Sequence, residues 1–241
     1  REDRGNGIAV ISAGRESRLM NVVFEGMGSP NGMVGGLTGM VTFYESPVNF
    51  TGCAFSGNSS EDALNIVNSE FVLESCSFEQ NFSDAFDGDF VEGSVRNCRF
   101  IESGNDSIDV SGSAIEISDV YVNNAGDKGI SAGERSFVVI ERATVVNSDI
   151  AIVSKDSSEV HLTDARLVNN RIGFSAFQKK EEFGSAEMVS NDHILENLGI
   201  GHLIEKGSSL ILDGERVSDF VEDVKSKLYG VKDGKSSKIA P

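Results

Sequence analysis

A repeat of apolar residues every 22 positions constrains this chain more than any other feature of its sequence. The members of one apolar column are separated by 23 residues once and by 22 residues at every later step. A fixed period of this length is typical of a solenoid, in which each repeat stacks on its neighbours. The column consists of Val41, Leu64, Phe86, Ile108, Ile130, Ile152 and Phe174.

Three further columns follow nearly the same period. One contains Leu73, Val95, Ile117, Val139 and Leu162, and another contains Phe55, Phe78, Phe100, Tyr121, Val145, Leu167 and Val189. The last contains Asn58, Asn81, Asn124, Asn147, Asn169 and Asn191, with Ser103 in its one gap. Apolar and polar residues alternate around the columns, as in strands, and Asn tolerates the left-handed backbone of tight turns. The sequence therefore predicts an all-β fold, a right-handed parallel β-helix of about eight rungs with three short strands per rung.

The sequence also allows predictions for the three cysteines and for one irregular segment. Cys53, Cys76 and Cys98 follow the same period, so we expect stacked core thiols, with a disulfide between neighbouring rungs as the alternative. Residues 26–37 exceed the length of a rung and predict a protruding loop.

The last part of the chain departs from the repeat. Val221, Val224 and Leu228 have helical spacing and Gly230 follows as a stop. We expect a short helix within residues 218–229 that caps the open end of the coil or leads into another domain. The predicted division is a β-helix domain over residues 1–216 and a capping helix with a flexible tail or linker over residues 217–241.

Composition disfavours some classes of binding partner. The formal net charge of −17 disfavours nucleic acid, whose phosphates need clustered Lys and Arg. No apolar run reaches the length of about 18 residues that spans a bilayer, so membrane insertion is not expected. The chain opens on REDRGNG without a secretory signal, which indicates a boundary inside a longer protein.

Several repeated segments resemble a known superfamily. The Asn column, the 22-residue period and Asp-rich segments such as SDAFDGDFVEG (83–93) and NDSIDVSGS (105–113) are similar to the right-handed β-helix, or pectate-lyase-like, superfamily. Within it, the chain resembles an Asp-rich bacterial subgroup found with CotH-type kinase-like and lamin-tail-like domains in cell-envelope proteins. The resemblance covers roughly residues 7–215 and implies an extracytoplasmic location, but it implies no particular activity.

Strand alternation predicts which side chains leave the core. One outward column contains Thr42, Asn65, Asp87, Asp109, Ser131, Val153 and Ser175, and a second contains Tyr44, Val67, Asp89, Ser111, Gly133, Lys155 and Phe177. A third outward position contains Ser113, Arg135, Ser157 and Lys179, with Glu134 and Asp156 at the strand ends. The acids therefore gather near residues 87–109 and the bases near residues 155–180.

The repulsion between the stacked acids must be reduced. Asp87 and Asp109 are expected about 5 Å apart, where two charges repel by about 3 kcal/mol at an effective dielectric of 20. One carboxyl can keep its proton, a Ca²⁺-like cation can bind Asp87, Asp89 and Asp109, or nearby Lys and Arg can neutralise them. The plain alternative is a solvating strand face. Another stack, Asp62, Asp84 and Asp106 followed by Lys128, is expected to have a structural role at the strand entrance, as is Asp127.

These columns lead to three hypotheses about function. The first is an enzyme acting on a polysaccharide, a lyase, an epimerase or a glycoside hydrolase, with Asp87, Asp89, Asp109 and Lys155 as catalytic residues. The expected substrate-binding residues are Tyr44, Asn65, Ser111, Ser131, Glu134, Asp156, Phe177 and Lys179. The second is a non-catalytic cell-envelope module that binds glycan, peptide or cations, and the third is a structural spacer in a larger protein.

Overall fold

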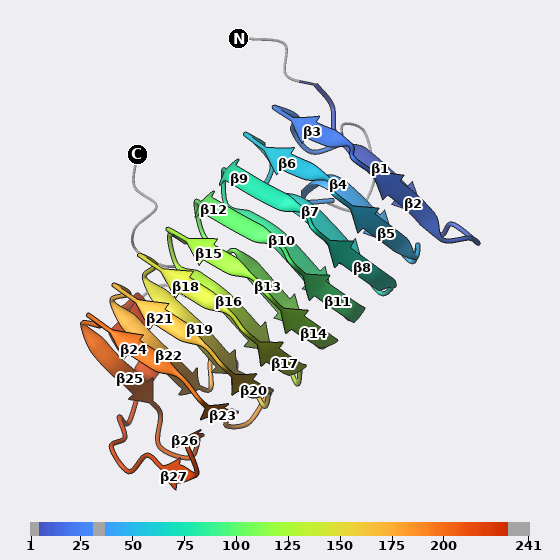
Figure 1. Ribbon diagram of the computed structural model, residues 1–241. Helices are drawn as coiled ribbons and strands as arrows, with labels where there is room; N and C mark the ends of the chain where they lie inside the picture. The colour runs from blue at the N-terminus through green and yellow to red at the C-terminus, as the bar shows by residue number, and fades with distance from the viewer. Residues whose placement is uncertain (1–4, 31–36, 231–241) are drawn as a thin grey trace.

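The strands wind into a parallel β-helix with about eight turns (Figure 1), as predicted. The computed structural model describes residues 5–30 and 37–230. Each turn contributes one strand to each of three sheets, here called sheets A, B and C. Every strand pair within the sheets is parallel except the last pair of sheet B.

The described strands are short. Sheet A contains β1 (Ile8–Ile11), β4 (Gly39–Tyr44), β7 (Asp62–Val67), β10 (Asp84–Asp89), β13 (Ile108–Ser111), β16 (Lys128–Gly133), β19 (Ile150–Lys155), β22 (Ile172–Phe177) and β25 (Ile200–Ile204). Sheet B contains β2 (Ser17–Met20), β5 (Val48–Thr51), β8 (Glu70–Glu74), β11 (Glu92–Arg96), β14 (Ala114–Ser118), β17 (Phe137–Glu141), β20 (Glu159–Thr163), β23 (Glu187–Asn191), β26 (Ser209–Leu212) and β27 (Glu215–Arg216). Sheet C contains β3 (Val23–Glu25), β6 (Ala54–Ser56), β9 (Ser77–Asn81), β12 (Arg99–Ser103), β15 (Tyr121–Asn123), β18 (Thr144–Val146), β21 (Arg166–Val168) and β24 (Ile194–Glu196).

The core fills the space between the three sheets. All members of the first predicted column pair in direct register and are buried. In sheet C, the rings of Phe24, Phe55, Phe78 and Phe100 stack with centroid separations of 4.9, 4.6 and 4.8 Å. These separations match the spacing of neighbouring strands, so the aromatic ladder follows directly from the register.

Two other predicted columns need correction. Ile117 pairs with Ile140, not with Val139, because this step is 23 residues long and a one-residue slip moves a side chain to the other face. In sheet C, Phe100 pairs with Val122 rather than Tyr121. Val189 belongs to sheet B, and the place predicted for it is taken by Leu195.

The predicted Asn column is two columns in the structure. Asn58, Asn81 and Ser103 are buried, and the Nδ2 of Asn81 donates to the Oδ1 of Asn58 at 3.3 Å. Asn124, Asn147 and Asn169 are exposed one position earlier in the turn, with φ values of 64°, 57° and 57°. Only this second group needs the left-handed tolerance of Asn. Asn191 lies in β23 and belongs to neither column.

The three cysteines are buried free thiols, as expected. The backbone N–H of Cys76 donates to the Sγ of Cys98 at 3.4 Å, which places these two thiols on neighbouring rungs. Of the predicted loop over residues 26–37, positions 31–36 lie outside the described residues.

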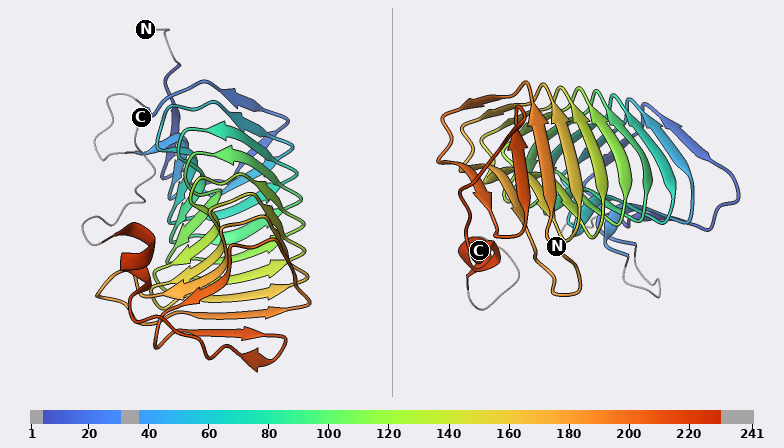
Figure 2. Two further views of the ribbon diagram at one scale, coloured as in Figure 1. Left: turned by 90° about the vertical axis from the view of Figure 1, so that its left-hand side faces the viewer. Right: turned by 90° about the horizontal axis from the view of Figure 1, so that it is seen from below.

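One short helix, α1 (Val224–Tyr229), follows the last strand. It lies beside the coil and not over the open end (Figure 2), because Val224 and Tyr229 pack with Val153, Phe177 and Leu203 on the outside of sheet A. The last edge of sheet B is instead covered by β27, which pairs antiparallel with β26. Among the described residues, no helix is long and apolar enough to cross a membrane.

Candidate functional site

The outer face of sheet A brings the predicted site residues together. Asn65, Asp87, Asp109 and Ser131 are in direct register across four neighbouring strands. Val67, Asp89, Ser111 and Gly133 form the parallel column beside them. Both outward columns are therefore as predicted for these rungs.

A third column on the same face was assigned a structural role from the sequence. Asp62 pairs directly with Asp84, and the backbone N–H groups of Asp106 and Lys128 donate to the carboxylates one rung below, at 2.8 and 2.9 Å. Lys128 Nζ lies 5.8 Å from the ring centroid of Tyr229, which packs on the outside of sheet A. The 22-residue spacing of the three aspartates was the available signal for this column.

The face has two parts with different charge. The acidic half comprises Asp62, Asp84, Asp87 and Asp89 on strands β7 and β10. The basic half comprises Lys128, Lys155 and Lys179, contributed by β16, β19 and the segment after β22. Asp106 and Asp109 on the rung of β13 lie between the two halves and pair with lysines of the basic half.

Asp109 is held as a carboxylate. The Nζ of Lys155 lies 3.3 Å from its Oδ1 and donates to the Oγ of Ser131 at 2.8 Å. Burial opposes ionisation of Asp109, but the charges of Lys155 and Lys128 and a hydrogen bond from Ser131 outweigh it. The pKa of Asp109 therefore lies below its ordinary value.

Asp87, one rung away, has the opposite environment. Its Oδ2 accepts a hydrogen bond from the Nδ2 of Asn65 at 3.1 Å, and no described cation pairs with it. Burial raises the pKa of Asp87 well above its ordinary value, and the charges of Asp62 and Asp89 add to the shift. Asp87 therefore retains a proton at a pH at which Asp109 is ionised.

The other carboxyls of the acidic half also favour the protonated form. Burial raises the pKa of Asp62 to about 8 and that of Asp84 to about 6. Burial, followed by the charge of Asp109, raises the pKa of Asp89. The acidic half is a set of neighbouring carboxyls that repel one another and are short of positive partners.

The basic half is covered by α1. Phe177 is fully buried and its ring lies 6.4 Å from that of Tyr229, so it is not open to a ligand as predicted. Lys128 is buried between Asp106 and Asp127, and their charges keep its pKa well above the ordinary value against the effect of burial. Lys179 is half-buried, and burial together with Lys155 lowers its pKa to about 8.

Several predicted binding residues have structural partners. The Oδ1 of Asp156 accepts from the backbone N–H groups of Lys179 and Lys180 at 2.6 and 2.7 Å, so this buried carboxylate holds the segment after β22. Glu134 pairs with Lys180. Ser113, predicted to point outward, is buried, and its Oγ accepts from the backbone N–H of Val91 at 3.0 Å. Tyr44 and Ser111 remain accessible beside the acidic half.

No group of three or more His, Cys, Asp or Glu side chains within residues 5–30 and 37–230 has the arrangement of a metal site. Asp87 and Asp89 point out of one strand two positions apart, and Asp109 is already engaged by Lys155. The expected Ca²⁺ site at these three residues therefore has no preformed ligand cluster in the structure.

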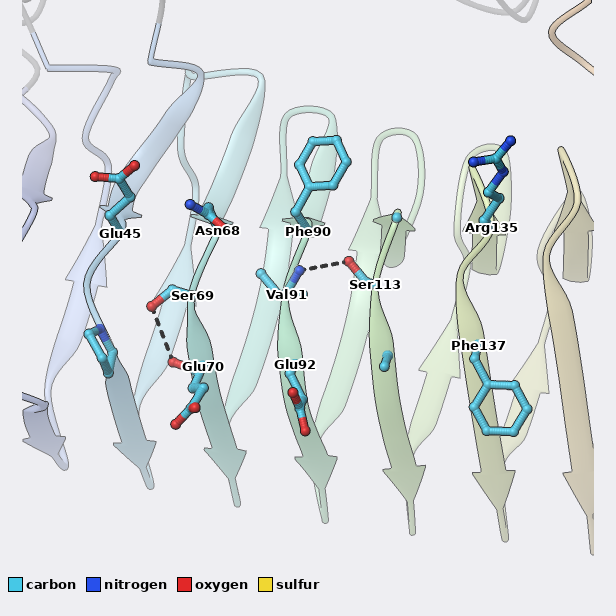
Figure 3. Close-up of a pocket in the computed structure, with 13 residues that line it drawn as sticks. Glu45, Asn68, Ser69, Glu70, Phe90, Val91, Glu92, Ser113, Arg135 and Phe137 are labelled. Atoms are coloured by element: carbon cyan, nitrogen blue, oxygen red, sulfur yellow. Dashed lines mark hydrogen bonds between the residues drawn. The ribbon is translucent and has the colours of Figure 1, made fainter. Parts of the chain in front are cut away.

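A groove that the sequence did not reveal runs along the turns between sheets A and B (Figure 3). It has a volume of about 700 Å³, and it crosses the rungs of Glu45, Asn68, Phe90, Gly112 and Arg135. The side chains of Phe90 and Phe137 are 60% and 46% exposed in it. Phe90 directly follows Asp89, so the groove borders the acidic half. The available signal was an aromatic residue at a turn, where polar residues are usual.

Comparisons with known proteins add little to this geometry. No family model and no curated protein matches the chain. Among solved structures, the chain is similar to the catalytic domain of a GH87 α-1,3-glucanase in complex with nigerose, at 10% identity and a TM-score of 0.41. The D1069A form of such a domain with tetrasaccharides gives 10% identity and a TM-score of 0.37. The matches cover 85% and 86% of this chain but only 55% of each of those chains.

Proposed function

We propose that this protein hydrolyses an extended polysaccharide that lies along the coil axis, across the acidic half and the adjoining groove. In this mechanism Asp87 is the general acid and Asp109 is the carboxylate that attacks the sugar. The observation that carries the proposal is the contrast between these two side chains on neighbouring rungs. Lys155 and Ser131 hold Asp109 ionised, whereas Asp87 accepts a hydrogen bond from Asn65, lies near other acids and has no ion pair among the described residues.

Such a pair matches the requirements of glycoside hydrolysis. The Asp87 carboxyl donates its proton to the glycosidic oxygen as that bond breaks, while an oxygen of Asp109 forms an ester with the anomeric carbon. Water then cleaves the ester, and the ionised Asp87 takes up the proton of this water. Neighbouring strands are about 4.8 Å apart, close to the separation of about 5 Å at which two carboxyls favour retention of configuration.

The surroundings support an extended ligand. The groove follows the direction of the coil axis over five rungs, and exposed aromatic rings of Phe90 and Phe137 offer apolar faces to sugar rings. Tyr44 is 37% exposed in the column that contains Asp89, two rungs before it. Polar and aromatic side chains thus both line a path that a linear polymer can follow.

Substitution of the pair tests the proposal. Asp87→Asn and Asp109→Asn are each expected to lower turnover roughly 10³-fold on the polysaccharide that the native protein cleaves, measured by reducing-end release over a panel of neutral, acidic and amino polysaccharides. Asp164→Asn is the matched control, because Asp164 is exposed at the opposite corner of the coil with a φ of 57° that Asn tolerates.

The pH profile gives a second test. The rate should fall as the pH rises through the raised pKa of Asp87, and it should fall again as the pH drops through the lowered pKa of Asp109. Full activity in both Asn variants would overturn this assignment. Tight binding of a polysaccharide without any turnover would favour the alternative of a non-catalytic binding module.

A further inference from the structure

The acidic half lacks the positive partners that the rest of the face has. Among the ion pairs of the described residues, none involves Asp62, Asp84, Asp87 or Asp89. The Oδ2 of Asp62 has no hydrogen-bond partner, although its side chain is only 2% exposed. Its neighbour in direct register is another carboxyl, that of Asp84. A buried carboxyl oxygen without a donor is costly, so this site favours a ligand that brings donors and positive charge.

The same sheet shows how a primary ammonium group satisfies such carboxyls. The Nζ of Lys155 lies 3.3 Å from Asp109 and 2.8 Å from Ser131, and the Nζ of Lys128 lies 3.3 Å from both oxygens of Asp106. These contacts are made at outward positions of β16 and β19, in the columns that continue the acidic half. The fold therefore already accommodates ammonium groups next to buried carboxyls on this face.

We infer that the acidic half binds the protonated amino groups of an amino-sugar polymer, which makes a polysaccharide with free amino groups the substrate class. This inference rests on the proposed function, because that function places a polysaccharide along the same columns. The acids on the two neighbouring strands β7 and β10 complement successive positive charges of such a polymer. An ammonium group is itself the donor and needs only carboxyl oxygens within reach as acceptors, so it does not require the closed set of ligands that the described residues lack for a metal.

Binding should displace protons from the protein. Burial raises the pKa of Asp62 to about 8 and that of Asp84 to about 6, so these groups are wholly or partly protonated near neutral pH. A nearby ammonium favours the ionised form, as Lys155 does for Asp109. Protons released by the carboxyls then appear in the buffer, whereas weak attraction to distant surface charge releases none.

The experiment compares a fully deacetylated glucosamine hexamer with the N-acetylglucosamine hexamer by isothermal titration calorimetry, in two buffers with different ionisation enthalpies. The amino hexamer should bind at least tenfold more tightly and should release protons. Asp62→Asn with Asp84→Asn should abolish this preference. The matched control combines Asp164→Asn with Asp192→Asn, which removes two exposed carboxyls on neighbouring rungs at the opposite corner and should retain it.

Asp89→Asn is a second variant, chosen because it should change binding without impairing folding. Asp89 is half-buried and its side chain makes no hydrogen bond or ion pair with the described residues, so its substitution should leave the melting temperature unchanged while weakening binding of the amino hexamer severalfold. Equal binding of the two hexamers, or an equal loss in the control pair, would overturn the inference. Calcium alone that stabilises the protein and displaces the hexamer at millimolar concentration would also overturn it, because the site would then take metal ions.

The two proposals fail in different ways. If a neutral or acetylated polysaccharide is cleaved and the amino hexamer binds no more tightly, the inference is wrong and the hydrolase remains. If the amino hexamer binds through Asp62 and Asp84 but no polysaccharide is cleaved, the binding site remains and the hydrolase is wrong.

Discussion

The acidic and basic halves of sheet A occupy equivalent outward positions of the same coil, yet their side chains differ in charge, in ion-pair partners and in protonation. In the basic half Lys128 and Lys155 are buried and paired with carboxylates that keep them charged, and Lys128 and half-buried Lys179 lie against Tyr229 of α1. In the acidic half the carboxyls have no cation of their own, and burial favours their protonated forms. The comparison teaches that the fold provides the columns, whereas the partner on the next rung decides whether a side chain stabilises the structure or stays available for chemistry.

Removal of Lys128 should have the largest effect on stability. Lys128→Met leaves Asp106 and Asp127 buried without their cation, and breaking a buried ion pair of this kind costs about 3 to 5 kcal/mol. Urea unfolding at pH 7 measures the loss. Lys206→Met is the control, because Lys206 and Glu222 form an exposed pair that contributes little. A loss no larger than that of the control would show that the buried triad does not stabilise the basic half.

Removal of Lys155 should have an intermediate effect that depends on pH. The pKa of Asp109 is below its ordinary value, so its contribution to stability is present above the unfolded pKa of about 4 and is lost as the pH falls through the folded pKa. Lys155→Met removes the main cause of this shift. We expect a loss of roughly 2 kcal/mol at pH 7 that becomes smaller below pH 4, measured by urea unfolding at both pH values. An equal loss at both would contradict the assigned role.

The smallest effect has the opposite sign. A carboxyl with a raised pKa contributes stability below its unfolded pKa of about 4, and this contribution is lost as the pH rises through the folded pKa, which is about 8 for Asp62. Asp62→Asn should therefore stabilise the protein at pH 8 and leave its free energy of unfolding almost unchanged at pH 4, measured by urea unfolding at both pH values. Asp164→Asn should change neither value. A destabilised Asp62→Asn protein at pH 8 would mean that the ionised Asp62 has a stabilising partner.

Much of the fold could be predicted from the sequence because residues 22 positions apart lie side by side on neighbouring rungs. Any residue that matched the period had its neighbours fixed by parallel register, so the columns of Asp87 and Asp89 were correct. One error came where an extra residue entered a turn. Val139 was taken for Ile140 because that step has 23 residues and the strand period is two.

The contacts and burial of the site residues could not be predicted from this period. Burial of Phe177 and Lys155 depends on α1 returning along the coil to pack on sheet A, and no periodic pattern encodes that return. The stack of Asp62, Asp84 and Asp106 was visible, but alternation placed it in a turn and not on the outer face. The groove around Phe90 arises from five successive turns in three dimensions, so it also had no counterpart in one rung of sequence.

The antiparallel pairing of β27 has a consequence for how these molecules behave at high concentration. An open edge of a parallel sheet is a template on which another chain can add strands and begin a fibril. In sheet B this edge is occupied by β27, which consists of the charged residues Glu215 and Arg216. Because β27 is antiparallel to β26, a further parallel rung cannot be added there. Two coils that meet end to end cannot continue sheet B in register, so the charged hairpin blocks strand addition at this edge.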